Sequence, residues 1–118
     1  MSLHKNVNAV DASVLDVGKG VSMKMLLSGD ESPNFAMRNF IIEAGGHMPL
    51  HTNSVEHEQF VLSGRARIQL GGETIEAVAG DVLLIPAGVA HSYVALGEEA
   101  YSFLCLVPKG EDHVEILK

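Results

Sequence analysis

Short apolar runs separated by glycine and proline constrain the fold of this chain more than any other feature. The runs are about 5–10 residues long and rich in Val, Ile, Leu and Phe, which is typical of β-strands. Residues 65–70 alternate polar and apolar side chains, the period of a half-buried strand, and Gly71-Gly72 follows where a two-residue hairpin turn belongs. No segment shows the 3.6-residue period of an amphipathic helix. The sequence therefore predicts an all-β sandwich or barrel with little or no helix.

The 118 residues suffice for one domain with a hydrophobic core. The strongest strand patterns lie at residues 35–43, 65–70, 73–77, 82–85, 91–96 and 100–107. We expect the barrel to span residues 21–108, with residues 1–20 as an N-terminal arm and residues 109–118 as a C-terminal tail.

Composition excludes several classes of partner. The net charge is −7, from 15 acidic and 8 basic residues, and no Lys/Arg cluster is present. This argues against binding to nucleic acid or to an anionic membrane. No run approaches the ~20 apolar residues of a membrane-spanning helix, and the N-terminus lacks the apolar core of a signal peptide. The lone Cys105 fits a reducing compartment, so we expect a cytoplasmic location.

Three of the six histidines lie beside expected strand starts and close to turns, where a rigid scaffold commonly places binding residues: His51, His57 and His91. The other three lie in polar tails or in a turn, where no site role is favoured: His4, His47 and His113.

Two segments of the chain resemble the two motifs of the cupin family, G-x5-H-x-H-x3-E-x6-G and G-x5-P-x-G-x2-H-x3-N. The first reads GGHMPLHTNSVEHEQFVLSG, over residues 45–64, and the second reads GDVLLIPAGVAH, over residues 80–91. Two ordered motifs are far less expected by chance than either alone. The resemblance covers about residues 20–108 and implies a double-stranded β-helix of the cupin or jelly-roll type.

Within the first motif, Gly45, His51 and Gly64 hold their positions, while Asn53 and His57 replace the second His and the Glu. The second motif keeps its glycines, proline and histidine but ends on a different residue: Gly80, Pro86, Gly88, His91 and, in place of Asn, Ala95. The flanking segments PNFAMRNF and FLCLVP are similar to small cupins that bind manganese through four histidines. The resemblance thus implies one divalent transition metal per chain, Mn in the first place and Fe, Ni, Co, Cu or Zn otherwise, and a homodimer.

The resemblance implies His51, His57 and His91 as the metal ligands, and strand spacing supports this set. Residues two apart on a strand share a face, so His51 and Asn53 point the same way, and Asn53 is a weaker candidate because an amide oxygen is a poor ligand for these metals. Neighbouring strand residues face opposite sides, so His57 and Glu58 cannot both bind. The motif spacing favours His57, with Glu58 as the alternative.

Two further polar side chains are candidates for a catalytic or substrate-binding role. Gln59 shares the inward face of His57 and could orient a bound water or oxygen, or simply be a polar residue at the rim. Arg38 shares a face with apolar neighbours and could clamp a substrate carboxylate, or form an interface or internal ion pair.

Three functions remain open at this level. A three-histidine site leaves coordination positions free for a small carboxylate or oxygenated ligand, as in a metal-dependent oxygenase, decarboxylase or isomerase. The alternatives are a small-molecule binding or sensing module without catalysis, and a barrel that has lost its metal, which the Asn53 replacement favours.

Overall fold

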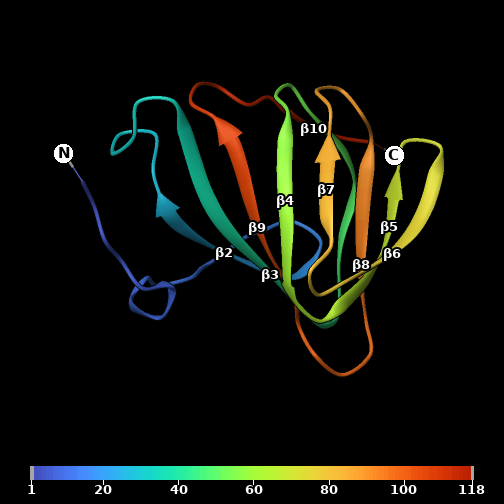
Figure 1. Ribbon diagram of the computed structural model, residues 1–118. Coiled ribbons are helices and arrows are strands. Elements are labelled where there is room, and N and C mark those ends of the chain that lie inside the picture. Colours follow the sequence, from blue (N-terminus) through green and yellow to red (C-terminus); the bar gives the residue numbers. More distant parts are fainter. Residues whose placement is uncertain (1, 118) are drawn as a thin grey trace.

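The computed structural model describes residues 2–117 and is built almost entirely from antiparallel strands (Figure 1). Its one helical element is a short 3₁₀ turn, η1 (Val7–Ala9). The strands are β1 (Ser13–Val14), β2 (Lys19–Leu27), β3 (Phe35–Asn53), β4 (His57–Ser63), β5 (Arg65–Leu70), β6 (Glu73–Val78), β7 (Val82–Ile85), β8 (His91–Leu96), β9 (Tyr101–Pro108) and β10 (Val114–Ile116). The predicted all-β jelly-roll barrel is therefore confirmed.

The strands form one curled sheet, in the order β6-β5-β8-β3-β9-β4-β7, with β2 and β10 also paired to β3. The long strand β3 belongs to both halves of the barrel. Its first part, Phe35–Ile42, pairs with β9, and its second part, from His47 to His51, pairs with β8. One continuous strand with two different neighbours thus joins the two halves of the barrel.

The expected strands and the hairpin agree closely with the structure. Leu70 pairs with Glu73 across Gly71-Gly72, as a two-residue turn requires. The largest difference is in β3, where the expected strand at residues 35–43 continues through Gly45-Gly46 to Asn53. The glycines bend the strand rather than end it.

Residues 1–20 and 109–118 were expected to be an arm and a tail, and parts of both pair with the barrel. Ser13–Val14 pairs with β2, and Val114–Ile116 pairs with β3 opposite His51–Asn53. Met1 and Lys118 lie outside the described residues. Within residues 2–117, no helix is long and apolar enough to cross a membrane.

Alternating side chains fill the barrel interior. In β4 every second residue is buried, and β8 and β9 alternate in the same way. Aromatic rings pack at the centre. The ring centroids of Tyr93 and Phe103 are 5.3 Å apart in a stacked arrangement, and those of Tyr101 and Phe103 are 5.4 Å apart. This apolar floor leaves the polar residues to one end of the barrel.

Gly64, between β4 and β5, is a position that only glycine fits. Its φ is +77°, and a Cβ atom there would lie 2.3 Å from the carbonyl oxygen of Ala100. Gly80 also has a positive φ, +93°, but a Cβ atom there would meet nothing within 4 Å. An alanine at Gly80 would therefore meet only the strain of a positive φ, whereas an alanine at Gly64 would meet the same strain and a clash with the backbone.

Gly64→Ala should lower the free energy of unfolding by more than about 2 kcal/mol, since it adds a clash with fixed backbone to the cost of a left-handed conformation. Gly80→Ala, which carries only the conformational cost, is the matched control and should lose about 1–2 kcal/mol. Urea denaturation of both variants measures the difference. Equal losses would contradict the close approach of Gly64 to β9.

Candidate functional site

Three of the six histidines and four other polar residues meet in one pocket of about 220 Å³. The polar lining residues are Arg38, His51, Asn53, His57, Gln59, His91 and Asp112. The remaining wall is mainly apolar and comprises Leu15, Val17, Met23, Phe40, Met48, Tyr93, Phe103, Cys105, Val114 and Ile116. A few polar groups converging in an apolar concavity are the usual composition of a small-molecule site.

His51 and His91 are direct neighbours across the β3–β8 pairing, with ring centroids 4.2 Å apart. Each ring is held through Nδ1 by a backbone carbonyl two residues before it: His51 by Pro49 at 2.7 Å, and His91 by Val89 at 2.9 Å. An Nδ1–H that donates to a carbonyl leaves Nε2 with its lone pair free, the arrangement seen in metal-binding histidines. Burial lowers the pKa of His91 to about 4, so its ring is neutral at physiological pH.

His57, the first residue of β4, lies in a different hydrogen-bonding environment. Its Nε2 is 3.2 Å from Oδ2 of Asp112, and its Nδ1 is 3.4 Å from Sγ of Cys105. Burial, followed by the positive charge of Arg38, lowers the pKa of His57. Burial also raises the pKa of Cys105, so the thiol stays protonated and can donate to Nδ1, while Nε2–H donates to Asp112. Cys105 packs in the hydrophobic core and forms a hydrogen bond with His57.

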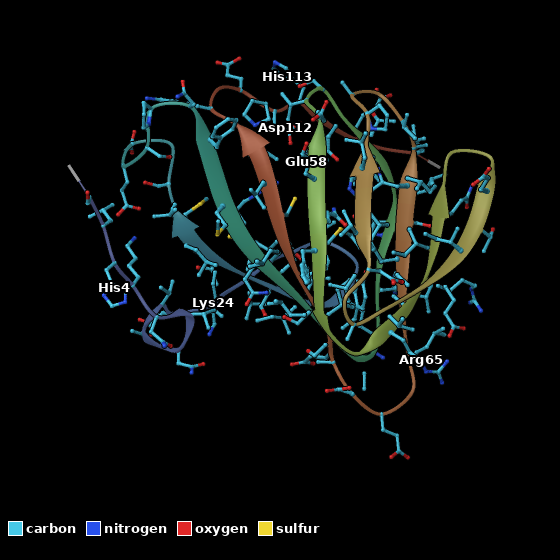
Figure 2. All side chains as sticks on the ribbon, viewed as in Figure 1. His4, Lys24, Glu58, Arg65, Asp112 and His113 are labelled. Carbon is cyan, nitrogen blue, oxygen red and sulfur yellow. The ribbon has the colours of Figure 1, made fainter. Side chains whose placement is uncertain are left out.

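Strand parity places the first-motif residues as the sequence predicted. His51, Asn53 and His57 are buried, whereas Glu58 is exposed on the outer face of β4 (Figure 2). Asn53 does reach the pocket, but its amide Nδ2 donates to Oδ2 of Asp112 at 3.0 Å, and its buried Oδ1 has no hydrogen-bond partner. The side-chain oxygen Oδ1 of Asn53 is therefore free for a ligand or a water molecule.

Arg38 and Gln59 flank Cys105 across the sheet, since Cys105 pairs with Arg38 on β3 and with Gln59 on β4. Arg38 stacks on the Phe40 ring at 4.9 Å and donates to the Cys105 sulfur at 3.2 Å. Within residues 2–117 its guanidinium forms no ion pair, and Nε has no hydrogen-bond partner. The internal ion pair considered from the sequence is thus not formed in the described part of the chain.

Gln59 is fixed at one end and free at the other. Its Nε2 donates to the Tyr93 hydroxyl at 2.8 Å, while its buried Oε1 has no partner. An acceptor held in this way inside a pocket can orient a bound water or hydroxyl. The other histidines contribute nothing here, because His4, His47 and His113 are exposed.

Sequence reasoning missed Asp112. The residue lies in the segment expected to be a tail, only one residue away from the exposed His113, and no alternation marks the strand that follows. Its carboxylate nevertheless lines the pocket and contacts His57 and Asn53. The only available signal was chemical, a short acidic segment after the last barrel strand.

The donor set has the right chemistry for a transition metal, because neutral imidazoles and a carboxylate suit Mn, Fe, Co, Ni, Cu and Zn. Two rings are already oriented by backbone carbonyls, and the unpartnered Asn53 Oδ1 adds an oxygen without a hydrogen bond. Across residues 2–117, however, no three His, Cys, Asp or Glu side chains form a ready-made metal site. Binding at His57 Nε2 requires the other tautomer, in which Nδ1–H donates to the Cys105 sulfur.

Comparison with known proteins identifies the family. The model of the family described as "Cupin domain" matches residues 38–107, more than half of the chain, so the chain belongs to the cupin family. A curated relative, 1-methylthio-D-xylulose 5-phosphate methylsulfurylase of Rhodospirillum rubrum, is 28% identical over 98 residues, which are 83% of this chain and 62% of that protein. An uncharacterized protein of Streptomyces coelicolor is 33% identical over 66 residues, 56% of this chain and 63% of that protein. The matches thus span just under two thirds of these relatives' lengths.

Solved structures agree on the fold. The polyketide cyclase RemF from Streptomyces resistomycificus has a TM-score of 0.91 at 24% identity, covering 100% of this chain and 87% of that one. A cupin-2 domain protein from Rhodospirillum rubrum has a TM-score of 0.86, also at 24% identity, covering 100% and 82%. At these identities the likeness establishes the jelly-roll barrel and nothing about chemistry.

The floor of the pocket yields a stability prediction. Tyr93→Phe removes the acceptor of the buried Gln59 amide and should cost about 1–3 kcal/mol of unfolding free energy. Tyr101→Phe is the matched control, because the buried Tyr101 hydroxyl has no partner, and its removal should be neutral or stabilising. Thermal and urea unfolding compare the two variants. A Tyr101→Phe loss as large as that of Tyr93→Phe would refute this hydrogen-bonding scheme.

Proposed function

We propose that this protein is a metal-dependent cupin, in which His51, His57 and His91 bind one divalent transition-metal ion. The observation that carries the proposal is the pairing of His51 and His91, two buried rings held by backbone carbonyls with both Nε2 atoms free. Manganese is the favoured metal because of the resemblance noted in the sequence, with Fe, Ni, Co, Cu and Zn as the other candidates.

The second half of the proposal concerns the ligand. Arg38 lines the pocket with a cationic group that has no carboxylate partner in residues 2–117, which suits a small organic molecule with an anionic or oxygenated end. The apolar walls suit its hydrocarbon part, and Gln59 Oε1 offers an acceptor for a hydroxyl or water. Three protein ligands leave room for such a molecule at the metal.

A bound ion would supply Lewis acidity toward an oxygen of the ligand. The protein's own contribution is to keep the imidazoles of His57 and His91 neutral by burial, to hold the anionic end at Arg38 and to exclude water with apolar walls. We place the activity among oxygenases, decarboxylases and isomerases of small organic acids. The name of the curated relative, a methylsulfurylase, supports an enzymatic role for a barrel of this kind.

Purified protein, without a histidine tag, should take up close to one equivalent of Mn²⁺ or another of these metals per chain. His51→Ala and His91→Ala should weaken binding by about 100-fold or more while the barrel stays folded, because strand packing supplies most of the core. His47→Ala, at an exposed histidine, is the control and should bind as the wild type does. Elemental mass spectrometry and competition with a chelator measure both quantities.

Unchanged stoichiometry in His51→Ala and His91→Ala would overturn the assignment. An absence of metal binding by the wild type would favour the other candidate, a metal-free ligand-binding barrel. The His57–Asp112 contact supports this candidate, because it engages the Nε2 atom that a metal would need. Binding of candidate acids by the metal-free protein would then be the defining activity.

We further propose that the protein is a cytoplasmic homodimer. The location rests on its single buried thiol, Cys105. For the dimer, the outer faces of β4 and β7 expose apolar side chains that a second copy would cover: Phe60, Leu62, Val82 and Leu84.

Light scattering should give twice the chain mass of 12.6 kDa. Val82→Lys should shift the protein toward monomer, because it puts a charge into the apolar face without disturbing the core. The control Val14→Lys, at a residue that is at least as exposed but lies on β1, should leave the dimer intact. A monomeric wild type at micromolar concentration would contradict the proposal.

A further inference from the structure

The C-terminal segment passes over the end of the barrel that holds the histidines. Figure 1 shows it crossing from the end of β9, and Figure 2 places Asp112 at this end of the barrel. Strand β10 pairs with the end of β3, so that Val114 lies opposite Asn53 and Ile116 opposite His51. The segment is thereby fixed to the strand that carries two of the site residues.

The Asp112 carboxylate is held in one orientation by both of its oxygens. Oδ1 accepts from the backbone N–H of Ser54 at 3.0 Å. Oδ2 accepts from Nδ2 of Asn53 at 3.0 Å and lies 3.2 Å from Nε2 of His57. The outer oxygen is anchored to the β3–β4 loop, and the inner oxygen faces the histidine.

The His57–Asp112 distance fits two donors of one metal ion. Donor atoms bound at about 2.0–2.2 Å and at right angles to each other are about 3 Å apart. The ion would replace the Nε2 proton and lie to one side of the line from Nε2 to Oδ2, so the His57 ring would turn until its Nε2 lone pair points to the ion. Asn53 holds the carboxylate in place, because its Nδ2 donates to Oδ2 of Asp112. Its own Oδ1 has no hydrogen-bond partner and is buried in the same pocket.

Charge gives the second argument. Three neutral histidines leave the full +2 charge of the ion uncompensated, and Asp112 is the one carboxylate among the pocket-lining residues. Among residues 2–117 it pairs with no lysine or arginine, so its charge is available to the site.

We propose that Asp112, carried by the C-terminal strand, is the fourth protein ligand of the metal and that Asn53 positions it. The inference rests on the proposed metal binding at His51, His57 and His91. Asn53, which the sequence suggested as a weak ligand, becomes the residue that orients the actual carboxylate ligand. The acidic ligand, absent from the first motif, is then supplied from the other end of the chain.

The test compares Asp112→Asn with Glu111→Gln, since both remove one negative charge at neighbouring positions and the Glu111 side chain is exposed. Competition with a chelator gives the affinity of each variant for Mn²⁺ and Zn²⁺. Asp112→Asn should weaken binding by about 10-fold or more, whereas Glu111→Gln should stay within about twofold of the wild type. Asn53→Ala should show a smaller loss than Asp112→Asn.

Amide hydrogen exchange of residues 113–116 shows whether β10 stays attached in Asp112→Asn. Weaker binding with unchanged exchange supports direct ligation. A loss of affinity that follows detachment of β10, or an affinity within twofold of the wild type, overturns the role of Asp112 and leaves the three-histidine site standing. A wild type that binds no metal overturns the proposed function itself, and this inference with it.

Discussion

The whole arrangement depends on the bend of β3 at Gly45-Gly46. A Cβ atom at Gly46 would lie 2.5 Å from the carbonyl oxygen of Lys19, so only glycine allows the chain to turn there against β2. Because the strand continues past the bend, its first half pairs with β9 and its second half with β8. That exchange of partners sets His51 opposite His91 and brings residues 40 positions apart in the sequence into ring contact.

The two charged groups of the pocket act on the same histidine. Arg38 lowers the pKa of His57 and Asp112 raises it, although burial has the larger effect. Neither group is neutralised by a lysine, arginine or carboxylate in the described chain. An ion near Asp112 and an anionic group near Arg38 would therefore complement the pocket together, and each would favour binding of the other.

Strand parity explains how much of the site could be predicted from the sequence. A period of two residues is strict, so the shared face of His51 and Asn53 and the opposite faces of His57 and Glu58 could be predicted, while the motif spacing favoured His57 over Glu58 for the inner face. The continuation of β3 was not predicted, because a Gly-Gly pair reads equally as a turn or as a bend within a strand. The hydrogen-bond roles of Asn53 and Gln59 also required coordinates, since they depend on partners on other strands.

Asp112 marks the limit of such reasoning. All three residues of β10 are exposed, so no alternation distinguishes this strand from a solvated tail. What fixes Asp112 is a set of hydrogen bonds to residues more than 50 positions earlier, and such long-range contacts leave no local pattern. The acidic member of the site was invisible for that reason, whereas the histidines stood inside recognisable motifs.

Anomalous diffraction from crystals grown with Mn²⁺ tests the central claim most directly. The account predicts one peak per chain inside the barrel, about 2.0–2.3 Å from the Nε2 atoms of His51, His57 and His91. A barrel without a peak, in which His57 still donates to Asp112 and the rings of His51 and His91 bind no ion, would contradict it.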